Sequence, residues 1–214
     1  MNDLDILAKK YGTDKQTNSH GETKYHGYTP TFHNLFKNER GEFENILEIG
    51  VREGWSHKMW YDYFPNSMIY GVDNMGDPCI QNIKEEILAI ENDRIKLFIG
   101  DQEDEEFLEK SFKNKEFDLI LDDGGHHSRQ QQISFKVLFP KLKPGRYYII
   151  EDLGVCGMRE FREFDDIRSS TLTWLSEMQS NNFFSYYIKN GEDYMVRIES
   201  VQIIGELGVI KKRK

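Results

Sequence analysis

Short apolar runs alternate with longer segments of helical periodicity along most of the chain. Runs rich in Ile, Leu, Val and Tyr predict strands, and the segments between them predict helices. Strands that alternate with helices in this way are typical of a parallel, doubly wound sheet. The end of the chain predicts two further strands joined by a turn, which would close the sheet as an antiparallel hairpin. The expected strands before that hairpin are 43–49, 68–72, 95–99, 117–121 and 147–150.

We therefore expect an α/β fold with a mostly parallel, seven-stranded sheet, a C-terminal antiparallel hairpin and helices on both faces. Lys143-Pro144-Gly145 is predicted to be a turn before the fifth strand, and the closing turn is predicted around Gly205 to Gly208. The expected helices are 2–11, 31–36, 55–64, 80–90, an acidic segment at 103–112, 129–139 and most of 159–180.

The segment 13–30 is polar, rich in turn formers and unusually rich in aromatic and histidine side chains. It is either a plain surface loop or a lid over a site. We predict an N-terminal helix and lid-like segment over 1–40. Residues 41–214 are expected to form the main domain as a single structural unit.

Two of the predicted strands each end in a pair of acids, Asp122-Asp123 and Glu151-Asp152, and the histidines His126 and His127 follow the first pair. In an open parallel sheet, ligands bind outside the carboxyl ends of the strands. Burying so much unpaired negative charge would be costly, so a cation or polar ligand is expected there. We interpret these residues as a divalent-metal site beside a nucleotide-like cofactor. An alternative is that Asp122 or Asp123 only caps the helix that follows.

A second set of candidate residues lies after the first three strands. Gly50 and Gly54 allow a sharp turn and a close approach to a ligand, and Asp73 stands where a ribose diol is usually bound. Asp101 and Gln102 can hydrogen-bond an adenine edge or cap the acidic helix after them.

Composition narrows the class of protein. The net charge of −9 argues against a nucleic-acid partner, and the basic tail 211–214 is interpreted as a solvated end. Two cysteines are too few for a disulfide framework, which favours a reducing, cytoplasmic location. No apolar run approaches the length of about 20 residues that a membrane span needs, so no membrane partner is expected.

The motifs LEIGVREGWS, IYGVDN, GDQ, LDDGGHH and LFPKLKPGRYYIIEDL resemble those of class I S-adenosylmethionine-dependent methyltransferases, which have a Rossmann-like fold. Within that group, the chain is similar to the metal-dependent sugar O-methyltransferases of macrolide biosynthesis, of the mycinamicin and demethylmacrocin type. The N-terminal KYGTDK and HGYTP and the closing ESVQIIGELGVIKK also match, so the resemblance touches both ends of the chain.

The resemblance implies a role for each candidate residue. His126 would be the general base, and Asp122 would lie beside the cofactor. The metal ligands, for Mg²⁺ or else Mn²⁺ or Ca²⁺, would be Asp123, Glu151 and Asp152. The remaining residues that would bind S-adenosylmethionine are Glu48, Gly50, Gly54 and Ser56 for its methionine end, Asp73 for its ribose, and Asp101 and Gln102 near its adenine.

The implied reaction is methylation of a sugar hydroxyl, in which a metal-bound diol loses a proton to His126. The acceptor would be a small sugar-containing molecule: a nucleotide-activated sugar, a surface-glycan sugar or a glycosylated natural product. Departures at Gly124-Gly125, at Arg146 and in GVCGMREF after IEDL leave the acceptor open. A homo-oligomer is possible. The alternatives are a metal-dependent oxygenase of the kind labelled cephalosporin hydroxylase, and a non-catalytic cofactor-binding module.

Overall fold

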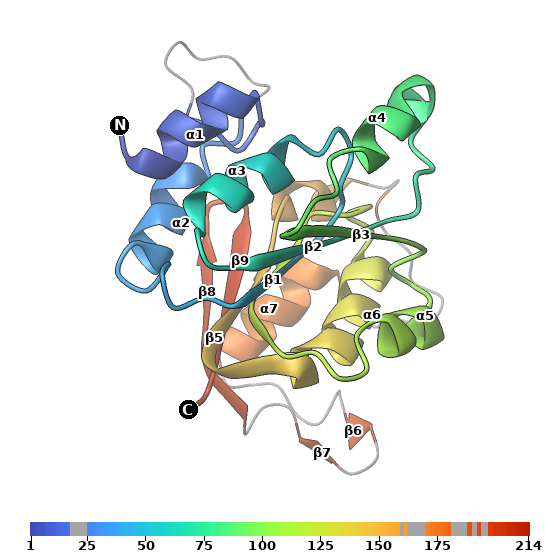
Figure 1. Cartoon of the computed structure of the whole chain (residues 1–214). Helices are drawn as coiled ribbons and strands as arrows, with labels where there is room; N and C mark the ends of the chain where they lie inside the picture. The colour runs from blue at the N-terminus through green and yellow to red at the C-terminus, as the bar shows by residue number, and fades with distance from the viewer. Residues whose placement is uncertain (18–24, 159–160, 162–169, 181–187, 190–191, 194–196) are drawn as a thin grey trace. The chain divides into compact units, whose positions relative to one another are not determined.

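The computed structural model describes residues 1–17, 25–158, 161, 170–180, 188–189, 192–193 and 197–214. The chain divides into two compact units, Met1–Ile99 and Gly100–Lys214. Each unit is described by itself below. In Figure 1 the first unit runs from blue to green and the second from green to red.

The first unit contains a parallel three-stranded arrangement in the order β3-β2-β1. All three strands occur where the apolar runs predict them. The register pairs Glu48 with Gly71, one step before the glycine turn at the end of β1. The strands are β1 (Asn45–Ile49), β2 (Met68–Asp73) and β3 (Ile95–Ile99).

The helices of the first unit pack through one aromatic cluster. Phe32 and Phe36 stack on each other, and each meets a ring from outside its own helix, Trp60 for Phe32 and Phe64 for Phe36. These rings are fully buried, so the cluster fixes the second helix of the chain against the third. The helices are α1 (Asp3–Tyr11), α2 (Thr29–Phe36), α3 (Trp55–Tyr63) and α4 (Lys84–Leu88), with the 3₁₀ helix η1 (Pro78–Ile83) before α4.

The single helix predicted over 80–90 is wrong in its first part. Residues 78–83 form a 3₁₀ helix, and the α-helix begins only after them. Asp77 accepts a hydrogen bond from the Cys79 amide, and the proline at the next position starts the turn there. Ile80 and Ile87 nevertheless pack with Val51 and Met75 in one small core, as their apolar spacing indicates.

The start of the 13–30 segment is not a plain surface loop. Thr13, Lys15 and Gln16 are all buried. The segment is held by Asp5 of α1, which accepts hydrogen bonds from the Thr17 amide and hydroxyl at 2.7 Å each and from the Thr29 hydroxyl at 2.8 Å. The lid predicted for the rest of the segment falls largely on 18–24, outside the described residues.

The second unit carries strands in the order β4-β5-β9-β8, in which β4 and β5 are parallel and β9 is antiparallel to both of its neighbours. The closing hairpin is therefore confirmed. Its strands are β4 (Phe117–Asp122), β5 (Leu142–Ile150), β8 (Ile198–Ile204) and β9 (Leu207–Lys212), and a separate pair is formed by β6 (Ile188–Lys189) and β7 (Glu192–Asp193).

The turn predicted at Lys143-Pro144-Gly145 is wrong, since β5 continues through these residues. The pairing with β4 shifts register between Phe117 and Leu119, and Gly145 takes a positive φ of 78°. A bulge of this kind absorbs the proline and glycine without ending the strand.

Helices of the second unit cover its sheet, with α6 against β4 and β5 and α7 against β8. Residues 159–160 and 162–169 of the helix predicted over 159–180 lie outside the described residues, and its last part is α7. None of the described helices is long and apolar enough to cross a membrane. The helices are α5 (Glu105–Ser111), α6 (Ser128–Leu138) and α7 (Thr171–Gln179), with the 3₁₀ helices η2 (Phe139–Lys141) and η3 (Leu153–Gly157).

The basic tail is not a solvated end throughout. Lys212 closes β9 with its side chain buried, and its ammonium group donates hydrogen bonds to the carbonyls of Phe139, Pro140 and Leu142. These carbonyls follow the C-terminus of α6, where a cation is favourable. The lysine thus ties the last strand to the end of that helix.

The predicted fold class is confirmed. Among the described residues, seven strands form the main sheet: β1–β2, β2–β3 and β4–β5 pair in parallel, β5–β9 and β8–β9 pair antiparallel, and helices pack on the strands.

We predict that Asp5→Ala lowers the free energy of unfolding by about 2–3 kcal/mol at pH 7, because one buried and two partly buried hydrogen bonds to a carboxylate are lost, together with the ion pair to Lys9. Burial raises the pKa of Asp5, but the hydrogen bonds from Thr17 and Thr29 outweigh it and leave the pKa below its ordinary value of 3.8. A depressed pKa stabilises the fold above pH 3.8 and loses this effect as the pH falls through the folded value. Urea denaturation at pH 7 and between pH 4 and pH 3 measures both effects.

Asp3→Ala is the matched control on the same helix, because the Asp3 side chain is 65% exposed and its ion pair within the described part of the chain is with Arg40. We expect it to cost less than about 1 kcal/mol. Equal losses in the two variants, or a difference that does not shrink in acid, would contradict the role given to Asp5.

Candidate functional site

The acid pairs of the second unit lie at the ends of neighbouring strands. Strand β4 ends at Asp122 and β5 at Ile150, and the Glu151 amide donates a 3.0 Å hydrogen bond to the Asp122 carbonyl. The parallel pairing of β4 with β5 therefore brings both pairs to one edge, as the sequence predicts.

One group of possible metal ligands gathers Asp123, His126 and Asp152, whose ligand atoms all lie within 4.8 Å of one another. Asp123 also has an oxygen within 4.8 Å of a Glu151 oxygen. Asp123 therefore lies close to both of the other predicted metal ligands. Glu151 is buried, and Asp152 is half-buried. Carboxylate oxygens in this number suit a hard cation such as Mg²⁺, so the residues present fit the predicted metal.

His126 sits directly against this carboxylate group. Its Nε2 lies 3.4 Å from Asp152 Oδ2, and its Nδ1 is buried with no hydrogen-bond partner among the described residues. Both residues have left-handed backbones, with φ of 60° for His126 and 57° for Asp152. The chain therefore accepts backbone strain to hold this imidazole beside this carboxylate.

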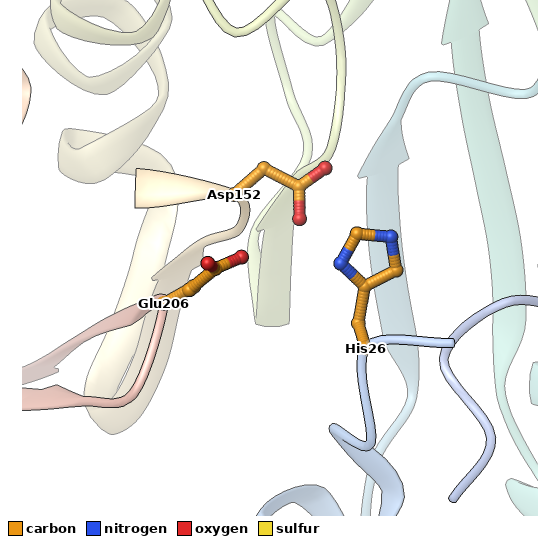
Figure 2. Close-up of side chains that lie close together, drawn as sticks. All are labelled: His26, Asp152 and Glu206. Carbon is orange, nitrogen blue, oxygen red and sulfur yellow. The ribbon is translucent and has the colours of Figure 1, made fainter. Parts of the chain in front are cut away.

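A further carboxylate lies near Asp152. Glu206, in the turn between β8 and β9, has an oxygen within 4.8 Å of an Asp152 oxygen (Figure 2). The Leu153 amide donates to the Glu206 carbonyl at 3.0 Å, which fixes that turn against the end of β5. His26, the third side chain drawn in Figure 2, belongs to the first unit. The sequence gives no signal for Glu206, because its place depends on the hairpin.

Asp122 is separate from the metal group and fully buried. Burial raises its pKa to about 6, although a hydrogen bond from Gln102 and the charge of His126 act in the opposite direction. The Tyr148 hydroxyl also donates to Asp122, at 3.4 Å. Asp122 is thus stabilised largely by neutral donors.

Gln102 organises the loop after β4. Its side-chain amide nitrogen donates to Asp122 Oδ1 at 3.2 Å and to Ser134 Oγ at 3.1 Å, and its oxygen accepts from the Gly125 amide at 2.9 Å. Gln102 is only 7% exposed. Its side chain is therefore engaged within the unit, and the predicted adenine contact remains a prediction.

The capping interpretations are corrected by the structure. His127, rather than Asp122 or Asp123, is the N-cap residue of α6, and its amide donates to the Gln130 side chain at 3.4 Å. Asp104, rather than Asp101 or Gln102, caps α5 by accepting from the Phe107 amide. Asp101 instead accepts from the Glu103 amide in a local turn and is exposed.

The glycine turn of the first unit is tied to Asp73. One oxygen of Asp73 accepts from the amides of Val51 and Arg52 at 2.8 and 2.9 Å, and the other accepts from the Met75 amide at 2.6 Å. Gly50 and Gly54 have φ of 92° and 75°. A Cβ on Gly54 would lie 2.6 Å from Ile90 Cδ1, so the turn requires a glycine there. The geometry brings Gly50 and Asp73 together, as predicted.

Glu48 and Ser56 are also brought together. The Ser56 hydroxyl donates to Glu48 Oε2 at 2.7 Å, and His57 Nδ1 lies 3.2 Å from the same oxygen. Lys15 Nζ lies 3.5 Å from Glu48 Oε1. Neither Lys15 nor His57 is among the site residues predicted from the sequence. The KYGTDK motif was the only signal for Lys15, and nothing in the sequence marks either residue as buried.

Mycinamicin VI 2''-O-methyltransferase of Micromonospora griseorubida is 33% identical over 160 residues, which are 71% of this chain and 36% of the relative. Demethylmacrocin O-methyltransferase of Streptomyces fradiae is 33% identical over 187 residues, 83% of this chain and 43% of the relative. No family model matches the chain.

Among solved structures, the methyltransferase MycE from the mycinamycin biosynthetic pathway, in complex with Mg, SAH and mycinamycin VI, is 27% identical with a TM-score of 0.77. The match covers 100% of this chain and 55% of that chain. The resemblance to macrolide sugar O-methyltransferases is therefore confirmed. The chain spans less than half the length of the curated relatives it matches.

We predict that Gln102→Leu lowers the free energy of unfolding by about 2–4 kcal/mol, because the Gly125 amide and a buried Asp122 oxygen lose their partner. Hydrogen exchange at the Gly125 amide, followed by NMR, should accelerate in the same variant. Asp101→Ala is the neighbouring control, and it removes only an exposed turn contact. If Gln102→Leu leaves exchange at Gly125 unchanged, Gln102 does not hold the loop.

Proposed function

We propose that the protein is an S-adenosylmethionine-dependent, divalent-metal-assisted O-methyltransferase that acts on a sugar hydroxyl. The observation that carries the proposal is the group of Asp123, His126 and Asp152 within 4.8 Å at the end of a parallel strand pair. The relatives named above support it, since they are O-methyltransferases by name.

Two bound groups would supply the chemistry. S-adenosylmethionine supplies an activated methyl group, and a hard cation makes a bound hydroxyl more acidic. We propose Asp123, Glu151 and Asp152 as the metal ligands. We propose Asp122, Asp101 and Gln102 as cofactor-binding residues of the second unit, and Glu48, Gly50, Gly54, Ser56 and Asp73 as those of the first unit.

His126 is proposed as the residue that takes the proton of the acceptor hydroxyl. An imidazole has an unperturbed pKa near 6.5, which suits a base at neutral pH. Asp152, 3.4 Å from Nε2, orients the ring and stabilises the imidazolium after proton transfer. The carboxylate group and the left-handed backbone of His126 hold this geometry before the acceptor binds, and positioning of this kind accounts for much of the rate enhancement in such transfers.

The acceptor is proposed to be a sugar on a glycosylated small molecule, since the relatives are named for mycinamicin VI and demethylmacrocin. The segment after Asp152 differs from the macrolide enzymes, so a screen should also include nucleotide sugars and surface-glycan sugars. Cytoplasmic location, a role in polysaccharide biosynthesis, a homo-oligomer and the absence of nucleic-acid and membrane partners stay predictions from the sequence.

A metal-dependent oxygenase is the competing function, because one histidine and two carboxylates can also bind iron. The predicted nucleoside-binding residues Gly50 and Asp73 favour the methyltransferase. Oxygen consumption that depends on iron and 2-oxoglutarate, with no methyl transfer, would reverse this choice. A non-catalytic module would bind S-adenosylhomocysteine and transfer no methyl group to any sugar in the screen.

We predict that EDTA abolishes methyl transfer and that added Mg²⁺ restores it, because the acidified hydroxyl depends on the cation. Asp152→Asn keeps a residue that tolerates a left-handed backbone and should raise the Mg²⁺ concentration for half-maximal rate by about tenfold or more. The control is Glu199→Gln, which removes an exposed carboxylate at the start of β8. Activity that survives complete chelation would remove the metal from the proposal.

We predict that His126→Asn lowers the rate of methyl transfer by about 10²–10⁴, because the proton acceptor is lost. Asparagine tolerates the left-handed backbone better than alanine, so the loop should keep its conformation. The matched control is His127→Asn, which keeps a good helix N-cap and should retain near-normal activity. Full activity in His126→Asn would show that another group takes the proton.

A further inference from the structure

A lysine is buried in the first unit next to a predicted cofactor-binding acid. The Lys15 side chain is 1% exposed, and its Nζ lies 3.5 Å from Glu48 Oε1 on a side chain that is 0% exposed. A buried ammonium or carboxylate is strongly unfavourable without partners, and the opposite charge at 3.5 Å offsets part of that cost for each of them.

The two carboxylate oxygens of Glu48 contact different residues. Lys15 lies at Oε1, while Ser56 donates to Oε2 at 2.7 Å and His57 Nδ1 lies 3.2 Å from that same oxygen. The contacts at Oε2 restrict the rotation of the carboxylate, and the ammonium group places a positive charge beside Oε1. The cluster therefore fixes both the charge and the orientation of Glu48.

The strand next to Glu48 leaves room for this cluster. Gly71 of β2 pairs with Glu48 of β1, and a Cβ at Gly71 would lie 2.5 Å from His57 Nε2. Any larger residue at that position would push His57 away from Glu48. The glycine is thus part of the arrangement that holds the carboxylate.

The backbone presents Lys15 from a rigid support. The Lys15 carbonyl accepts hydrogen bonds from the amides of Tyr28 and Thr29 at 3.0 and 3.2 Å. Two residues later, Thr17 is held by Asp5, which also accepts from the Thr29 hydroxyl. Hydrogen bonds from α1 and from the start of α2 therefore both hold the backbone that carries the Lys15 ammonium group.

We propose that Lys15 is a positioning residue that keeps Glu48 ionised and correctly oriented for the cofactor. This inference rests on the proposed function, in which Glu48 lines the methionine end of S-adenosylmethionine. Lys15 acts through Glu48 and does not contact the cofactor. The KYGTDK segment is in this way a structural part of the cofactor site of its own unit.

The test is a double-mutant cycle with K15M, E48Q and the K15M/E48Q double variant. Isothermal titration with S-adenosylhomocysteine gives the dissociation constant, and circular dichroism gives the folded fraction and Tm. We expect K15M to weaken binding at least tenfold in the wild-type background and less than twofold in the E48Q background. K37M, which removes an exposed lysine of the same unit, should bind as the wild type does.

If K15M alone folds poorly, a comparison of its Tm with that of the double variant still tests the inference. The double variant has no buried charge at this pair, so we expect its Tm to exceed that of K15M. Equal costs of K15M in both backgrounds, or a folded K15M that binds within twofold of wild type, would overturn the inference and leave the proposed function standing. A wild-type protein that binds no S-adenosylhomocysteine would overturn the proposed function, and the inference with it.

Discussion

The structure depends on carboxylates that are buried at the ends of strands. Glu48, Asp122 and Glu151 are at most 1% exposed, and each lies at or next to the last residue of an apolar strand. A buried carboxylate is tolerated only with partners that replace its lost hydration. The surrounding loops, caps and helix starts of each unit are built to supply those partners.

The two units stabilise their buried carboxylates with different kinds of partner. Glu48 is stabilised by a buried cation, Lys15, together with Ser56. Asp122 is held mainly by neutral donors from Gln102 and Tyr148, and burial raises its pKa to about 6. Asp123 and Asp152 are more exposed than these two carboxylates, and Asp152 Oδ2 lies 3.4 Å from His126 Nε2.

Much of this architecture follows from the sequence, because strand position depends on local apolar runs and acids at strand ends are visible as Asp122-Asp123 and Glu151-Asp152. Features that depend on tertiary pairing were not predictable. The strand β5 continues through Gly145 because its partner β4 accepts a bulge. The burial of Lys15 and Lys212 depends on carboxylate and carbonyl partners distant in sequence. Composition alone assigns such lysines to the surface.

The residues with strained backbones lie next to carboxylate side chains. Among the described residues, the non-glycine residues with positive φ are Arg52, Met75, His126 and Asp152. The amides of Arg52 and Met75 donate to Asp73, so hydrogen bonds to one carboxylate offset their strain. His126 and Asp152 instead face each other at 3.4 Å. Strain of about 1–3 kcal/mol per residue persists only where the surroundings enforce it. The strained residues therefore fall into two groups: a turn held by hydrogen bonds to Asp73, and the His126–Asp152 pair that we propose as part of the catalytic site.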